Sequence, residues 1–215
     1  MKVFVRHCHI YEASLHKSRP QGFDREVLFQ KVLQTCPDLL VVLDSDKDHF
    51  TEKYTSNIIR IVGGCESKSF LALMKIVKDM GLQESWNLNT PIVFLEDDYA
   101  VSTSWADHIK EGLLFGDFVT LYDHPDKYIN PIPCKIFLGE QCHWRTTPST
   151  TNSYAMKFRT FLETYDIQSK FSENVSVTLD HYKFLSLWNS GKTLVSSLPG
   201  HWSHEETRMQ SKIAE

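Results

Sequence analysis

The chain has 215 residues, of which 41% are hydrophobic and 12% aromatic, with 23 Lys and Arg against 27 Asp and Glu. This length predicts one large α/β domain, and the near balance of charge argues against a nucleic-acid-binding protein and against a disordered acidic one. The apolar stretch 3–5 is too short for a signal peptide, and no segment reaches membrane-spanning length. We therefore expect no nucleic-acid partner, no membrane insertion and a cytoplasmic location.

The five cysteines are scattered and include no CxxC pair. This spacing favours reduced thiols over a disulfide framework or a zinc ribbon.

The first hundred residues alternate predicted strands and helices. Apolar, β-branched runs predict strands at 3–5, 39–43, 58–62 and 91–95. Helical periodicity predicts helices at 25–33, opened by Pro20 and Asp24, and at 67–80, preceded by Gly63 and Gly64. Strands joined by helical crossovers lie parallel, so a ligand is expected where their carboxyl ends meet.

The second half is richer in loops, because prolines interrupt it repeatedly. Its predicted helices are 105–114, with a cap in 102–104, then 153–164 and 179–189. Its predicted strands are 118–122, 135–138 and 193–197. The fold class is therefore α/β, as a single domain over 1–215: a mixed, mostly parallel sheet flanked by helices, with a loop-rich C-terminal half.

An acidic motif follows the fourth predicted strand. Residues 91–95 form an apolar run that ends in Glu96, Asp97 and Asp98. Because burying three adjacent carboxylates without a counter-charge is costly, a buried strand that carries them at its tip indicates a cation site, of the kind that holds a phosphorylated substrate. The alternative is an acidic turn that closes the strand.

Four further charged residues lie where a nucleotide would bind. Asp44 ends the second predicted strand and could accept hydrogen bonds from a base or ribose, whereas Arg6 ends the first and could bind phosphate. Lys17 and Arg19, in the loop that follows, could also bind phosphate. The alternative is ordinary solvated loop charge, which we favour for each of these two taken alone.

Several segments resemble one protein family. They are 94–101 with the acidic motif, 121–128, 144–152 and 197–205. They resemble GT-A glycosyltransferases, whose acidic metal-binding motif is of the DXD type, and in particular the small domains encoded by large algal (chlorella) DNA viruses and by some bacteria. The resemblance extends from Lys2 to about Glu206, and the order of the motifs strengthens it.

The resemblance implies a GT-A-like fold, a nucleotide-sugar donor that is commonly a UDP-sugar, and a Mn²⁺ or Mg²⁺ ion. Asp98 is then the first-ranked metal ligand, Asp97 contacts either the ion through water or the ribose hydroxyls, and Glu96 braces the motif. Enzymes of this group complete the metal shell with a histidine near the C-terminus. We rank His204 first and His201 second, and the alternative is a pair of surface histidines.

The resemblance also suggests residues for the acceptor. Asp180 lies at about the chain position where inverting GT-A enzymes carry their general base; the alternative is an N-cap aspartate. Three polar residues of the 144–152 motif could bind sugar hydroxyls or cap a helix, and Trp144 could stack on a sugar ring. The three polar residues are Ser149, Thr150 and Asn152.

The predicted function is a metal-dependent glycosyltransferase that moves a hexose or deoxyhexose from a UDP-sugar to a glycan or glycoprotein acceptor. Residues 1–100 would bind the nucleotide sugar and 101–215 the acceptor, with the host cytoplasm as the location if the chain is encoded by a virus. The alternatives are a metal-dependent nucleotidyltransferase or other phosphoryl-transfer enzyme, and a non-catalytic sugar-nucleotide-binding module.

Overall fold

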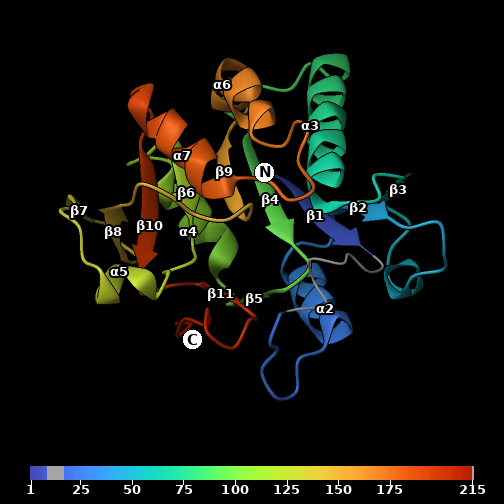
Figure 1. Cartoon of the computed structure of the whole chain (residues 1–215), viewed down its shortest axis with the longest axis horizontal. Helices are drawn as coiled ribbons and strands as arrows, with labels where there is room; N and C mark the ends of the chain where they lie inside the picture. The colour runs from blue at the N-terminus through green and yellow to red at the C-terminus, as the bar shows by residue number, and fades with distance from the viewer. Residues whose placement is uncertain (9–16, 215) are drawn as a thin grey trace.

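The computed structural model describes residues 1–8 and 17–214. Its main sheet has nine strands in the order β3-β2-β1-β4-β9-β6-β10-β8-β7, and two short strands, β5 and β11, form a second sheet (Figure 1). In chain order the elements are β1 (Lys2–Cys8), α2 (Arg25–Thr35), β2 (Leu40–Asp44), the 3-10 helix η1 (Phe50–Lys53), β3 (Ile58–Ile61), α3 (Glu66–Gln83), β4 (Pro91–Glu96), β5 (Tyr99–Val101), α4 (Trp105–Gly112), β6 (Phe118–Thr120), α5 (Asp126–Ile129), β7 (Ile136–Leu138), β8 (His143–Thr146), β9 (Tyr154–Lys157), α6 (Phe158–Lys170), α7 (Asp180–Asn189), β10 (Leu194–Leu198) and β11 (Trp202–His204).

The N-terminal half confirms the predicted parallel sheet. Strands β3, β2, β1 and β4 pair in parallel, and Arg6 of β1 lies directly opposite Glu96 of β4. Asp24 caps α2 as expected, because its side chain accepts a hydrogen bond from the Glu26 amide at 2.8 Å. The carboxyl ends of β1 and β4 therefore bring the acidic motif beside the charged end of the first strand.

The segment predicted as a helix at 153–164 is in part a strand, so that prediction is wrong at its start. Residues 154–157 form β9, which runs antiparallel between β4 and β6, and α6 begins only at Phe158. Tyr154, Ala155 and Met156 are fully buried, and tertiary pairing on both sides outweighs the weak local preference.

Two other local differences affect the site. The acidic motif does not lead directly into a helix; it leads into β5, and Ser104 precedes α4 without a side-chain capping bond. The segment 143–146, which was not expected to be regular, forms β8 between β10 and β7.

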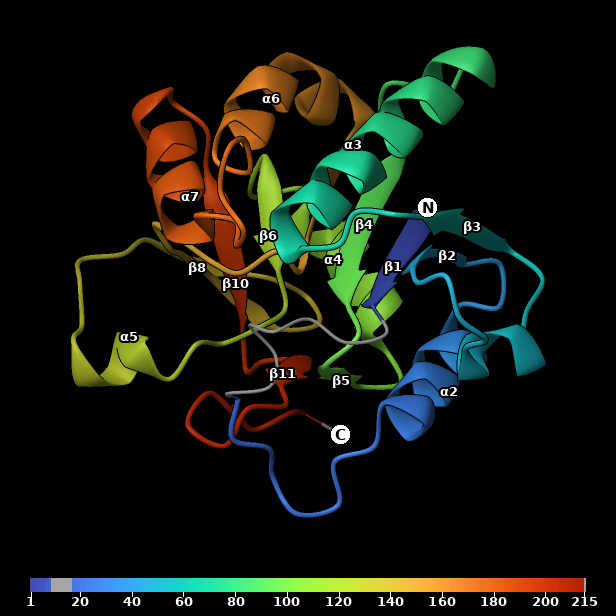
Figure 2. The same ribbon diagram turned by 45° about the vertical axis from the view of Figure 1, so that its right-hand side comes forward.

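Helices cover both faces of the sheet. Figures 1 and 2 show α3, α6 and α7 side by side, and their apolar side chains pack on Phe4, Phe94 and Phe118. Helices α2 and α4 pack on the opposite face of the sheet, where Val5 and Leu95 point. These side chains lie there because successive residues of a strand face opposite sides of the sheet. The sheet is thus buried on both sides, as a mostly parallel sheet requires.

Strands β5 and β11 attach the C-terminal segment to the edge where the acidic motif lies. They pair antiparallel, and His204 lies opposite Tyr99, the residue that follows Asp98. The Glu205 amide also donates to the Asp98 carbonyl at 2.8 Å. Over residues 1–8 and 17–214, the helices are too short or too polar to cross a bilayer.

Candidate functional site

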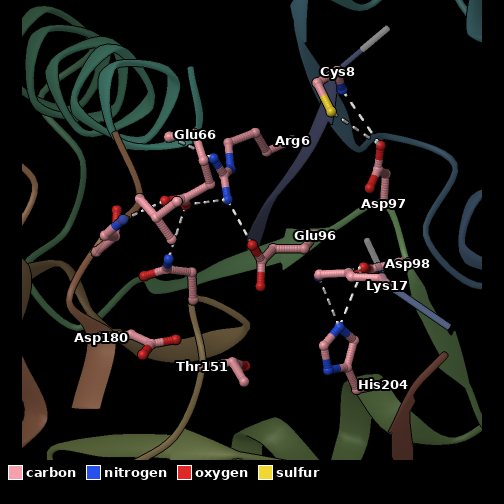
Figure 3. Close-up of a pocket in the computed structure, with 13 residues that line it drawn as sticks. Arg6, Cys8, Lys17, Glu66, Glu96, Asp97, Asp98, Thr151, Asp180 and His204 are labelled. Atoms are coloured by element: carbon pink, nitrogen blue, oxygen red, sulfur yellow. Dashed lines mark hydrogen bonds and ion pairs between the residues drawn. The ribbon is translucent and has the colours of Figure 1, made fainter. Parts of the chain in front are cut away.

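A pocket of about 150 Å³ opens at the carboxyl ends of β1 and β4 (Figure 3). Its wall combines carboxylates with basic and small polar side chains from distant parts of the chain. The lining residues are Arg6, Cys8, Lys17, Glu66, Glu96, Asp97, Asp98, Thr151, Asn152, Val177, Thr178, Asp180 and His204. The described chain therefore places one group of predicted site residues around one cavity, namely Asp97, Asp98 and His204 for the metal, Arg6 and Lys17 for phosphate, and Asp180 for the base.

Asp98 contacts three basic or imidazole side chains at the edge of this pocket. Its Oδ2 atom lies 3.0 Å from Lys17 Nζ, 3.0 Å from Arg19 Nη1 and 3.2 Å from His204 Nε2. Burial alone would raise the pKa of Asp98, but the hydrogen bond and charge of His204 and the charges of Lys17 and Arg19 hold that pKa well below its usual value. Asp98 is therefore an anion at neutral pH.

The Asp98 and His204 side chains fit a divalent ion. Adjacent ligands of an octahedral ion with bonds of about 2.1 Å lie about 3 Å apart, and the two ligand atoms are 3.2 Å apart. The Lys17 ammonium lies 3.0 Å from Asp98 and 3.3 Å from His204, so this place already accepts a positive charge. An oxygen and an imidazole nitrogen, with phosphate oxygens and water completing the shell, suit Mn²⁺.

Asp97 points to another side of the motif. Its Oδ2 lies 3.4 Å from the Cys8 amide nitrogen, a contact drawn in Figure 3. The same oxygen lies 3.6 Å from Arg25 Nε and 3.7 Å from His7 Nδ1. Burial raises the pKa of Asp97. Asp97 therefore does not face His204. Its contact with an ion through water, or with the ribose, stays a prediction.

Arg6 holds two carboxylates together at the base of the pocket. Its guanidinium lies 2.7 Å from Glu66 and 2.6 Å from Glu96, and its side chain is only 6% exposed. Burial opposes ionisation of Glu66, but Arg6 and the Thr178 amide keep the pKa of Glu66 below its usual value. Burial raises the pKa of Glu96 to about 7, so Glu96 is the first of the pair to take a proton.

The raised pKa of Glu96 predicts a pH-dependent stability. Below about pH 4.5, Glu96 is protonated in both the folded and the unfolded state, and its contribution to stability is complete; that contribution is lost as the pH rises through about 7. Glu96→Gln mimics the protonated acid and should remove this loss. Urea unfolding of the wild type and of Glu96→Gln at about pH 5 and about pH 8 measures the free energy of unfolding of each protein. If the difference between the two proteins is the same at both pH values, the assignment is contradicted.

Asp180 lines the same pocket from the first turn of α7. The N-cap is Leu179 and no side chain caps the helix, so the alternative of an N-cap aspartate is wrong. Asp180 is partly exposed, and burial raises the pKa of its carboxyl. A carboxylate whose pKa moves toward neutrality is a better proton acceptor, which is compatible with a general base.

Asn152 joins the pocket to a buried lysine. Its amide nitrogen donates to Glu66 at 3.1 Å, and its side-chain oxygen accepts from Lys183 Nζ at 2.5 Å. Burial lowers the pKa of Lys183 to about 8. Asn152 is thus the member of the predicted sugar-binding group whose side chain reaches the pocket.

Other predicted sugar contacts lie elsewhere. Trp144 is fully buried in β8, where its indole donates to Glu111 at 3.0 Å, so the prediction that it stacks on a sugar is wrong. Thr150 is buried and donates to Thr120 instead of facing the pocket. Ser149 lies 3.0 Å from His181 Nδ1, outside the pocket lining, and its sugar contact stays a prediction.

Asp44 and His201 also lie outside the pocket lining. Asp44 accepts from the Gly63 amide at 2.9 Å, and a Cβ on Gly63 would lie 2.6 Å from the Asp44 carboxylate, so this close turn needs glycine. A nucleotide contact of Asp44 stays a prediction. His201 packs on His108, centroids 3.6 Å apart, so the prediction of His201 as second choice beside Asp98 is wrong.

The sequence analysis did not single out Glu66, which lines the pocket, or Lys183, which is not part of the lining but donates to Asn152. Both look like ordinary charges on amphipathic helices. Thr151, which also lines the pocket and hydrogen-bonds Tyr99 at 2.7 Å, lies in the polar loop of the 144–152 motif. The nearest signal was the pair Gly63-Gly64 before α3, because the absent Cβ of Gly63 lets the start of that helix lie close to Asp44 at the end of β2.

Comparison with known proteins identifies the fold. No family model and no curated protein matches the sequence. A glucose-1-phosphate thymidylyltransferase structure from Bacillus anthracis, in complex with sucrose, is 10% identical with a TM-score of 0.50, covering 94% of this chain and 89% of its own. The galactosyltransferase LgtC, in complex with donor and acceptor sugar analogs, is 10% identical with a TM-score of 0.45, covering 91% and 73%.

The chain spans about half of a third similar structure, the bifunctional IspDF from Campylobacter jejuni, covering 48% of that chain and 91% of this one, at 12% identity and a TM-score of 0.46. At such low identities only the fold is shared. The protein is a single mixed α/β domain with a largely parallel sheet flanked by helices, and it shares this fold with the thymidylyltransferase structure.

Proposed function

We propose that this protein is a metal-dependent glycosyltransferase that moves a hexose or deoxyhexose from a UDP-sugar to a glycan or glycoprotein acceptor. The observation that supports this most is the Asp98–His204 pair, 3.2 Å apart and flanked by Lys17 and Arg19. Asp180 lines the same pocket. The Asp98 carboxylate and the His204 imidazole suit a metal ion, and the basic side chains beside them suit a diphosphate. The Asp180 carboxylate suits an acceptor that reacts through a hydroxyl group.

The residues divide the chemistry between them. Asp98 and His204 would hold the ion, and Lys17 and Arg19 would bind phosphate oxygens. When bound, a divalent ion offsets the negative charge that develops on the departing diphosphate. The acceptor oxygen bonds to the anomeric carbon while the bond from that carbon to the diphosphate oxygen breaks, and UDP leaves with the electron pair. In an inverting reaction Asp180 takes the hydroxyl proton.

The test is a screen of nucleotide sugars with Mn²⁺, in which mass spectrometry follows donor hydrolysis and transfer to a panel of glycans. Release of free UDP with a glycosylated product supports the proposal. Release of pyrophosphate from a nucleoside triphosphate would favour a nucleotidyltransferase, since the same charges suit a triphosphate. Tight binding of an intact donor without turnover across the panel would favour a binding module.

Asp180→Asn is expected to lower kcat by about 100-fold, because a positioned proton acceptor contributes at least about that much. The affinity for UDP should change little, because Lys17, Arg19, Asp98 and His204 remain in place. Steady-state kinetics with calorimetric UDP binding measures the two effects separately. A kcat close to that of the wild type would exclude Asp180 as the base and leave a retaining reaction as the remaining choice.

Action in a host cytoplasm follows from the resemblance to the virus-encoded domains and is part of this proposal. It is tested by locating the tagged protein in a cell that produces its acceptor.

A further inference from the structure

Three side chains that can bind a metal meet away from the pocket. His108 lies on α4, Cys142 lies between β7 and β8, and His201 lies just before β11. One ligand atom from each is within 4.8 Å of the other two. All three are buried, with 5–8% of each residue exposed. Only the tertiary fold brings these distant residues together.

The second ring nitrogen of each histidine has its own partner. His108 Nδ1 lies 2.9 Å from the Ser104 carbonyl oxygen, and His201 Nδ1 lies 3.0 Å from the Ser102 hydroxyl. A carbonyl only accepts, so this contact places the His108 proton on Nδ1 and leaves the lone pair on Nε2. Histidine ligands of metals are held in this way, with the other nitrogen bonded to a carbonyl or similar acceptor.

A buried carboxylate adds negative charge beside the thiol. Glu111 Oε2 lies 3.9 Å from Cys142 Sγ and accepts from the Trp144 indole at 3.0 Å. Its other oxygen accepts from the Glu140 and Gln141 amides, at 2.6 and 3.0 Å. Among residues 1–8 and 17–214, Glu111 forms no ion pair. A divalent cation beside Cys142 would balance both a thiolate and this carboxylate.

We propose that His108, Cys142 and His201 bind one zinc ion, with water or Glu111 as the fourth ligand. Two imidazoles and a thiolate suit zinc, whereas Mn²⁺ and Mg²⁺ prefer oxygen ligands. The two imidazole rings are stacked, with centroids 3.6 Å apart and ring planes at 29°, and they would turn apart to face one ion. The ion would tie α4 and β8 to the segment that carries His204. This site does not depend on the proposed transferase activity.

The test begins with the full chain stripped of metal by a chelator, then dialysed and titrated with zinc. Asp98→Asn with His204→Gln serves as the background, so that zinc cannot bind at the pocket. We expect one zinc ion per chain by native mass spectrometry and calorimetry, with a higher melting temperature. If this background binds no zinc while circular dichroism shows it folded, the proposal is overturned.

Ligand variants then locate the ion. In the same background, His201→Gln and Cys142→Ser should each lower zinc affinity at least tenfold, whereas Cys36→Ser, at a free thiol on another element, should not. Cobalt bound in place of zinc should show a thiolate charge-transfer band that Cys142→Ser removes and Cys36→Ser keeps. This spectrum is decisive even where a variant folds poorly, because a band that persists in Cys142→Ser overturns the assignment.

Discussion

Replacing Arg6 by methionine is expected to lower the free energy of unfolding by about 3–5 kcal/mol, because removing one partner of a buried ion pair leaves the other charge unpaired. Here two partners, Glu66 and Glu96, would lose their shared cation, and their side chains are only 14% and 21% exposed. Urea denaturation at neutral pH measures the loss.

The matched control is Arg60→Met. Arg60 also pairs with a glutamate, Glu52, at 2.7 Å, but both side chains are more than a third exposed. Arg60→Met should therefore lower the free energy of unfolding by about 1 kcal/mol or less. Equal losses for Arg6→Met and Arg60→Met would show that the buried cluster contributes no more than a surface pair. Adding Glu66→Gln and Glu96→Gln to Arg6→Met should restore part of the stability, because no unpaired carboxylate then remains.

Asp98→Asn is expected to remove most of the Mn²⁺-dependent affinity for UDP, by about 100-fold or more, since even the outer partners of metal ligands are worth about 10–100-fold. Without Mn²⁺, Asp98→Asn should not weaken UDP binding. Lys17 and Arg19 lose their carboxylate partner, so the variant should bind UDP at least as well as the wild type. Calorimetry of UDP binding with and without Mn²⁺ measures both effects.

Asp97→Asn is the matched control for Asp98→Asn, because the two carboxylates are adjacent in sequence and their side chains are only 9% and 5% exposed. Asp97 faces Cys8 and Arg25, so its replacement should reduce the Mn²⁺-dependent affinity much less. Wild-type affinity and wild-type Mn²⁺ dependence in Asp98→Asn would show that the ion is not held at this carboxylate, and the metal-dependent mechanism would fail.

The two histidines of the C-terminal HxxH segment have different environments. His204 stacks on Tyr99 and contacts Asp98, whereas His201 stacks on His108 and contacts Ser102. The segment therefore links the pocket to the proposed zinc site.

Strands β1, β2 and β4 could be predicted because each carries an apolar run that is buried in the sheet, and such runs appear in the sequence whatever their partners are. The edge strand β3 is only partly buried, and its β-branched residues predicted it. The acidic motif could also be recognised in the sequence, because three carboxylates at the tip of a buried strand need a counter-charge. Asp98, His204 and Lys17, named from local pattern and family resemblance, do lie together.

Other features depend on contacts between distant segments. Residues 154–157 form a strand because β4 and β6 offer edges on both sides, and nothing within the segment itself specifies those neighbours. Trp144 has polar neighbours in sequence, yet it is buried because β8 pairs with β10.

Local periodicity in the sequence is enough to specify the α/β alternation, and the cost of burying charge is enough to identify the acidic strand end. Contacts between distant segments are needed to specify three other features: Arg6 binds Glu66 and Glu96, Asp97 faces away from His204, and His201 meets Cys142. The direction of a side chain and its partner depend on strand register and on loops that cross the sheet edge, and no local pattern specifies either.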